Sequence, residues 1–137
     1  IIPGLVGSEM CIRDSPYASH ANTPSGLSSK SILFDDSPEG VLAWEAYGTT
    51  LCYAANLVPT IADDIVSIDR AMQWGFNWSN GPFKAMDEIG PSKIIEKLKS
   101  EGKELPHMLK ILEESSSENF YNNKGQQLSH SGEWITL

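Results

Sequence analysis

The stretch IADDIVSIDRAMQWGFNWSNGPFKAMDEIG, from Ile61 to Gly90, decides how this chain is expected to fold. It predicts a helix, a sharp aromatic turn and a second helix. Apolar residues in its first half recur at helical spacing and share one face: Ile61, Ile65, Ile68 and Met72. We expect Thr60 to cap this first helix and Gly75 to end it in a left-handed conformation.

Acidic residues in the first helix are expected to have structural roles. Asp63 and Asp64 fall in its predicted first turn, where the helix dipole favours negative charge, and Asp63 can form a capping box with Thr60. Asp69 is expected on the surface beside Arg70. A metal site on Asp63, Asp64 and Asp69 is disfavoured, because hard cations need oxygen ligands that converge from several positions.

The turn from Phe76 to Pro82 is rich in aromatic, amide and glycine residues. Asn80 or Gly81 can cap the second helix, Pro82 suits its first turn, and Gly90 can end it. The start of this helix is expected to offer unpaired N–H groups and the positive end of a dipole to an anion or a carbonyl group.

A long helix is predicted before this stretch, from Ser37-Pro38 to about Leu57, with Pro59 beyond its end. One of its faces is an apolar stripe, which favours a core role over a cofactor site: Trp44, Tyr47, Leu51, Ala55 and Val58. The short run Ile32 to Phe34 before it is interpreted as a strand fragment or a hydrophobic staple.

Two further helices are predicted after Gly90, one starting at Pro91 and one at Pro106, and His107 is expected to be exposed. A small hairpin is predicted around Ser131-Gly132. The chain is thus interpreted as a helical domain over 31–122, a hairpin tail over 123–137, and a disordered or artefactual segment over 1–30, which lacks helical or strand periodicity. Part of this first segment resembles translated sequencing-adaptor read-through.

Composition limits the class of protein. The chain has 137 residues, 40% of them hydrophobic and 20% charged, which fits one globular domain. A net charge of −8 argues against nucleic acid and anionic membrane surfaces as partners. No apolar run is long enough to cross a bilayer. Cys11 and Cys52 provide neither a disulfide framework nor zinc-site spacing, so the cytoplasm is the expected location.

The stretch around the turn resembles the C-terminal helical domain of 3-hydroxyacyl-CoA dehydrogenases. That family has an Asp-rich helix ending in Met-x-x-Gly, an aromatic turn, Gly-Pro-Phe, and then an Asp and a Gly. This chain matches with Ala62-Asp63-Asp64-Ile65, Ile68-Asp69-Arg70-Ala71-Met72, Trp74-Gly75-Phe76, Gly81-Pro82-Phe83, Asp87 and Gly90. It looks most like the second helical repeat of multifunctional β-oxidation proteins that also carry an enoyl-CoA hydratase unit, and its end at Leu137 suggests a fragment.

The resemblance implies an all-α fold, a small helical bundle of the 6-phosphogluconate dehydrogenase C-terminal type, here with a short C-terminal β-hairpin. It implies a parent enzyme that oxidises 3-hydroxyacyl-CoA to 3-oxoacyl-CoA with NAD. The implied partners are a Rossmann NAD-binding domain, the hydratase unit, the acyl-CoA substrate and, in a homo-oligomer, further copies of the chain. The alternative is a non-catalytic helical interaction module.

No catalytic, cofactor-binding or metal-binding residue is assigned within this chain. It has no G-x-G-x-x-G turn for a dinucleotide. The family's Asn-Arg pair in the first helix is replaced by Val41-Leu42-Ala43-Trp44, which favours packing over catalysis. Because the resemblance places the turn beside the cleft between the helical and nucleotide domains, the candidate substrate-binding residues are Phe76, Asn77, Trp78, Gly81, Pro82 and Phe83.

Overall fold

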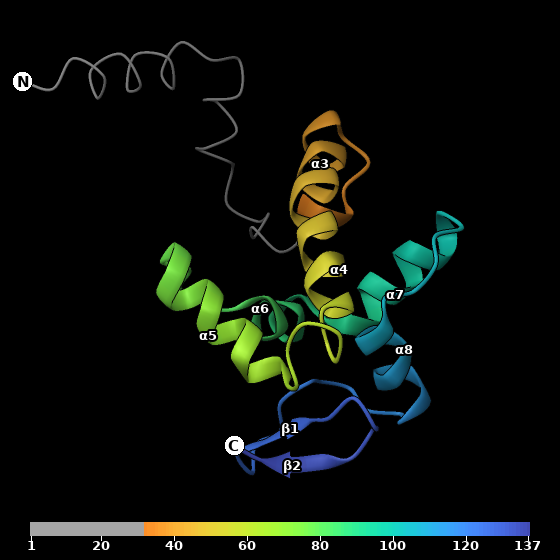
Figure 1. Cartoon of the computed structure of the whole chain (residues 1–137). Coiled ribbons are helices and arrows are strands. Elements are labelled where there is room, and N and C mark those ends of the chain that lie inside the picture. Colours follow the sequence, from red (N-terminus) through yellow and green to blue (C-terminus); the bar gives the residue numbers. More distant parts are fainter. Residues whose placement is uncertain (1–31) are drawn as a thin grey trace, which may run out of the picture.

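The computed structural model describes residues 32–137, so the proposed segment 1–30 lies outside the described residues. The described part is mainly helical and ends in a two-stranded antiparallel hairpin, which confirms the coarse fold class (Figure 1). The particular type of helical bundle stays a prediction.

A long rod forms the start of the fold (Figure 1). It consists of helix α3 (Pro38–Ala43), a π-helical segment η2 (Trp44–Gly48) and helix α4 (Thr49–Asn56). Ser37 caps it as expected, with its hydroxyl accepting a hydrogen bond from the Gly40 amide at 3.2 Å. The preceding run is a 3₁₀ helix, η1 (Ile32–Phe34), rather than a strand fragment, and it buries Leu33.

Helix α5 (Ile65–Phe76) starts four residues later than the sequence pattern predicts. Asp64, rather than Thr60, is its cap and accepts a hydrogen bond from the Ser67 amide at 2.7 Å. Aspartate caps a helix at least as well as threonine, so local chemistry does not favour the earlier start. Ile61 therefore lies in the preceding turn and is 73% exposed, which corrects its expected place on the buried face.

The end of α5 also differs from the expectation. The helix continues through Gly75, and Asn77 adopts the left-handed conformation with φ 56°. Its amide donates a hydrogen bond to the Met72 carbonyl. Asparagine is one of the few residues other than glycine that tolerates this region, because its short polar side chain can bond locally.

The remaining helices begin at or next to the prolines from which their starts are predicted. They are α6 (Pro82–Ile89), α7 (Pro91–Ser100) and α8 (His107–Glu114). Gly81 precedes the first of them and Gly90, with φ 101°, joins the first two. His107 is half-buried rather than exposed, and its Nε2 has no hydrogen-bond partner.

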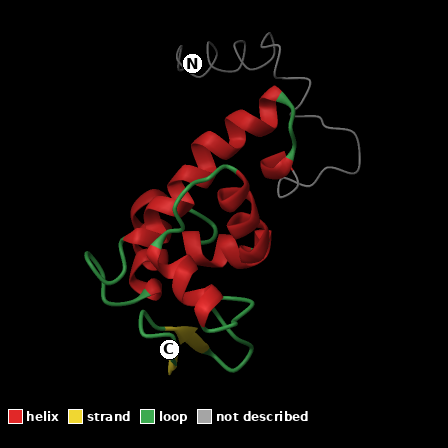
Figure 2. Ribbon diagram, turned by 90° about the vertical axis from the view of Figure 1, so that its right-hand side faces the viewer, coloured by secondary structure: helices red, strands yellow, loops and turns green. Residues whose placement is uncertain are grey.

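Strands β1 (Gln126–Leu128) and β2 (Trp134–Thr136) form the hairpin beneath the helices (Figure 2). Leu128 pairs with Trp134 and is fully buried, whereas the three residues of β2 are exposed. Tyr121, in the segment between α8 and the hairpin, forms an isolated antiparallel bridge with Gln127 of β1. In the core, the rings of Phe83 and Phe120 pack edge to face with centroids 5.0 Å apart, both fully buried.

Candidate functional site

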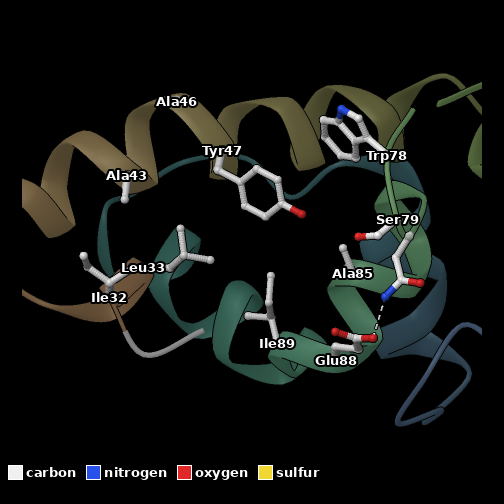
Figure 3. A pocket seen from close by; sticks show the side chains of 11 residues that line it. Ile32, Leu33, Ala43, Ala46, Tyr47, Trp78, Ser79, Ala85, Glu88 and Ile89 are labelled. Carbon is white, nitrogen blue, oxygen red and sulfur yellow. Dashed lines mark hydrogen bonds between the residues drawn. The ribbon is translucent and has the colours of Figure 1, made fainter. Parts of the chain in front are cut away.

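A cavity of about 630 Å³ lies beside the predicted turn, between the long rod and α6 (Figure 3). This volume is in the usual range for small-molecule sites. Its walls are mostly apolar, and Tyr47 points into it from the rod. The lining residues are Ile32, Leu33, Ala43, Ala46, Tyr47, Trp78, Ser79, Asn80, Ala85, Glu88 and Ile89.

Two aromatic rings stand at one end of the cavity. Tyr47 from the rod and Trp78 from the turn have ring centroids 5.7 Å apart and planes inclined by 30°. Burial, and then the charge of Glu88, raises the pKa of the Tyr47 phenol above its ordinary value. The phenol therefore stays protonated at neutral pH and can donate a hydrogen bond into the cavity.

The polar end of the cavity is formed where the turn meets α6. Asn80 Nδ2 donates to Glu88 Oε1 at 2.6 Å, as the dashed line in Figure 3 marks. This charge-assisted bond ties the middle of the turn to the side of α6. The cavity thus combines apolar walls with the phenol of Tyr47, the hydroxyl of Ser79, the amide of Asn80 and the carboxylate of Glu88.

A buried carboxylate fixes the end of the turn. Asp69 is 2% exposed, which overturns its expected surface position beside Arg70. Its Oδ1 accepts the Phe83 amide at 2.8 Å, and its Oδ2 accepts the Lys84 amide at 3.1 Å and the Tyr121 hydroxyl at 2.9 Å. Burial raises the pKa of Asp69, and these hydrogen bonds oppose that rise.

The Asp69 contacts change what the start of α6 can do. Its first amides were expected to be open to an anionic or carbonyl group of a ligand. Asp69 instead accepts two of them from within the fold. A helix start whose N–H groups and dipole already face a carboxylate has little left for a second anion. That reason for ligand binding at the turn does not hold.

A second carboxylate holds the segment that leads to the hairpin. Asp87 Oδ1 accepts the Phe120 amide at 2.7 Å, and Oδ2 accepts the Tyr121 amide at 2.9 Å. Desolvation raises the pKa of Asp87 to about 6, with a further contribution from the charge of Asp69, although both amides favour the ionised form. Asp69 therefore links α5 to the start of α6 and to Tyr121, and Asp87 links α6 to the segment at Phe120 and Tyr121.

The six predicted site residues are not all placed alike. Phe76 is 71% exposed, and Asn77 is the exposed left-handed end of α5. Gly81, Pro82 and Phe83 are buried in the frame of the fold. Of the six, the cavity lining includes Trp78. Substrate contact by these residues stays a prediction.

The sequence interpretation missed the part of the cavity that the helices contribute. Tyr47 was assigned to the core stripe, and Glu88 was given no role. The helical spacing holds a signal for both, because Ala43, Ala46 and Tyr47 share one face of the rod, as Ala85, Glu88 and Ile89 share one face of α6. Helix faces that mix small and polar residues are typical of cavity walls, but the sequence alone does not show that these faces of the rod and of α6 lie opposite each other.

Within residues 32–137, no group of three or more His, Cys, Asp or Glu side chains is arranged to hold a metal ion. Over the same residues, no helix combines the length and apolar character needed to span a bilayer.

Comparison with known proteins identifies two relatives. Over 92 residues, 67% of its length, the chain is 41% identical to the "Probable 3-hydroxyacyl-CoA dehydrogenase" of Bacillus subtilis, of which it spans 12%. Over 55 residues, 40% of its length, it is 38% identical to the "Putative fatty acid oxidation complex trifunctional enzyme" of Rickettsia felis, of which it spans 8%. No protein-family model matches the chain, and no solved structure matches it significantly. The chain is therefore similar to a small part of one protein named as a 3-hydroxyacyl-CoA dehydrogenase and of one named as a fatty acid oxidation enzyme.

Proposed function

We propose that this chain is the C-terminal helical part of a 3-hydroxyacyl-CoA dehydrogenase that acts in fatty acid oxidation. The observation that carries the proposal is the 41% identity over 92 residues with the Bacillus protein of that name. The whole enzyme would oxidise 3-hydroxyacyl-CoA to 3-oxoacyl-CoA in the cytoplasm. This part would shape the acyl-CoA cleft or hold domains together.

The residues described here do not fit NAD as a ligand of this part. A dinucleotide site needs a glycine-rich turn between a strand and a helix. The strands described in 32–137 form a two-stranded hairpin, in which a turn and then β2 follow β1, so they contain no strand that leads through a glycine-rich turn into a helix. We therefore assign NAD to a Rossmann domain elsewhere in the whole protein, and the multidomain name of the Rickettsia relative supports such an arrangement, with a hydratase unit as a further partner.

The turn and cavity give this part its contact with substrate. Among the six turn residues, Trp78 is the one we assign to that contact, because it lines the cavity with Tyr47. Gly81, Pro82 and Phe83 hold the turn in place through their burial against Asp69 and the core. A role in positioning, without proton transfer, fits this set of side chains.

A chimera tests the proposal. Residues 32–137 would replace the matching segment of the Bacillus relative, and NADH formation from a 3-hydroxyacyl-CoA would be measured beside the unaltered protein and a variant that lacks the segment. We expect the deletion to lose activity and the chimera to recover it. A folded chimera that is no more active than the deletion variant would contradict the proposal.

A non-catalytic interaction module is the second candidate, and one observation favours it. Trp74 and Phe76 both belong to the last turn of α5 and are 80% and 71% exposed. Large exposed aromatic residues are typical of contact surfaces between proteins. If the deletion variant keeps full dehydrogenase activity but loses its oligomeric state, this role replaces the first.

A further inference from the structure

We propose that the outer edge of strand β2 is a docking site for a second copy of this chain. The two β2 strands pair antiparallel there and join the two hairpins into one continuous sheet. The contact involves the backbone of Trp134 and Thr136, outside the cavity and the turn, and it is independent of the proposed dehydrogenase activity.

One edge of β2 is used within the fold. The Leu137 amide donates to the Gly125 carbonyl at 3.1 Å, and the Glu133 carbonyl accepts from the Ser129 amide at 2.8 Å. Ile135 lies midway between these two positions and is paired with β1. The odd-numbered positions of this segment therefore direct their backbone groups toward β1.

The other edge of β2 has its backbone groups turned outward. Backbone direction alternates along an antiparallel ladder, so the N–H and C=O groups of Trp134 and Thr136 point away from β1. Of the residues that the structure describes, none forms a strand on that side, because the sheet consists of β1 and β2. All three residues of β2 are exposed, and β2 lies farther from the helices than β1 does (Figure 1). Such an edge is a template for pairing with another strand.

One register matches this edge to itself. When Trp134 of one copy stands opposite Thr136 of the other, the two residues exchange both of their N–H···O=C hydrogen bonds. Two-fold symmetry generates a second, identical pair, so every outward N–H group of the two strands finds an acceptor. A shift by two residues leaves either Trp134 or Thr136 without a partner in the facing strand. Antiparallel pairing of two copies therefore satisfies the edge completely.

The side chains suit the same register. Trp134 of each copy lies beside Thr136 of the other, and aromatic residues paired with β-branched residues stabilise antiparallel sheets. Ile135, which is 40% exposed, stands opposite its own copy on the two-fold axis. Glu133 is the one charged side chain in 133–137 and faces Leu137, so no two charged side chains of this segment oppose each other. Because each chain has a net charge of −8, added salt should strengthen the contact.

Sedimentation equilibrium of the full 137-residue chain tests the contact. We expect a weak monomer–dimer equilibrium at about 0.1–1 mM protein, because two short strands bury far less than the about 1,200 Å² of a standard interface. Thr136→Pro removes an outward N–H from each copy and keeps the bonds to β1, so it should weaken the dimer about tenfold or more. Leu137→Pro is the matched control, because the N–H that it removes faces β1, and it should dimerise nearly as the parent does.

Cysteine cross-linking tests the register without removing any backbone donor. In a background of Cys11→Ser and Cys52→Ala, Ile135→Cys places two thiols opposite each other, with the about 4.5 Å Cα separation of a non-hydrogen-bonded pair. Oxidation with diamide should then form an intermolecular disulfide. Thr136→Cys is the control, because its Cα lies about 8–9 Å from that of its own copy, beyond the reach of a disulfide, and it should cross-link far more slowly.

Three results would each overturn the inference. They are a chain that stays monomeric at about 1 mM, a dimer that Thr136→Pro leaves unchanged, and equal rates of cross-linking at positions 135 and 136. The second result would move the contact to another surface, such as the exposed aromatic side chains of α5. The activity of the chimera decides the dehydrogenase proposal separately, because β2 pairing and NADH formation are measured on different proteins.

Discussion

The backbone of Gly81 lies directly against Asp69, a residue on a different helix. A Cβ added at Gly81 would stand 2.3 Å from both the Cα and the Cβ of Asp69. Gly81 has an ordinary φ of −73°, so the glycine is needed for this close approach and not for an unusual backbone conformation. The approach is what brings the first amides of α6 within reach of the Asp69 carboxylate.

Replacing Gly81 with alanine should destabilise the fold, because the contacting atoms of Asp69 include backbone that cannot rotate away. We expect a loss of about 1–3 kcal/mol in the free energy of unfolding, the usual cost of overpacking. The control is Gly75→Ala, where an added Cβ meets nothing within 4 Å and the site is helical, so stability should be unchanged or increased. Chemical denaturation of both variants gives the comparison, and equal midpoints would contradict the contact.

Asp69 itself should be one of the most sensitive polar positions in the chain. Asp69→Ala leaves the Phe83 and Lys84 amides without their acceptor, and we expect a loss of about 2–3 kcal/mol in stability. Tyr121→Phe removes only the hydroxyl donor to Asp69 and should cost about 1 kcal/mol. Urea denaturation measures both, and a Tyr121→Phe loss as large as that of Asp69→Ala would mean that the amide bonds matter little.

Much of the fold follows from local sequence signals. Proline and glycine at Pro82, Gly90 and Pro91 fixed the predicted limits of α6 and the start of α7, because these residues act through their own backbone restrictions. The start of α5 was misplaced because Thr60 and Asp64 are both good caps, and tertiary packing chooses between them. The spacing of apolar residues predicts Ile61 on the buried face of this helix, but Ile61 lies in the turn after α4 and is exposed to solvent.

The candidate site was harder to predict, because its parts come from three separate segments. Trp78 was identified from the turn, but its partner Tyr47 lies on the rod, and no local pattern indicates that the two rings meet. Asp69 was misplaced because an aspartate on a helix is usually exposed. Its burial depends on amides of α6 and a hydroxyl from Tyr121, which the sequence does not bring together.

The raised pKa of Asp87 predicts a pH-dependent stability. Its pKa is about 6 in the fold against an ordinary 3.8, so between these values the folded state binds the proton and the unfolded state does not. The contribution of Asp87 to the free energy of unfolding should therefore be complete at about pH 4 and be lost as pH rises through about 6. Because Asp87 is partly exposed, we expect this loss to be about 1 kcal/mol. The raised pKa of Asp69 acts in the same direction.

Asp87→Asn isolates this contribution, because an amide cannot titrate in that range. Unfolding free energies measured across the same pH window should decline less steeply for the variant than for the parent. The variant also loses one acceptor for the Phe120 and Tyr121 amides, which lowers its stability at every pH without changing the slope. Parallel curves for the two proteins would refute the assignment of the pH effect to Asp87.

Two truncations define the N-terminal limit of the fold. Removal of residues 1–30 should leave the melting temperature unchanged, because that segment has no periodic apolar face. Removal of residues 1–36 also deletes Leu33, which is 4% exposed in the core, and should lower the melting temperature by several degrees. Thermal unfolding of both forms is the measurement, and an equal loss in the two would show that the first segment contributes to stability.

Asn77 offers the last test, since it ends α5 with φ 56° and is one of the six predicted site residues. Asn77→Gly should preserve stability, because glycine adopts this conformation freely, whereas Asn77→Ala should cost about 1 kcal/mol or slightly more. The pair separates structure from binding, because both variants lack the amide side chain and only one is strained. If acyl-CoA binding by the chimera with the Bacillus relative falls equally in both variants, the side chain contacts the ligand. If it falls only in Asn77→Ala, or in neither, Asn77 serves the turn alone, and this second result is the one we expect from its exposed position outside the cavity lining.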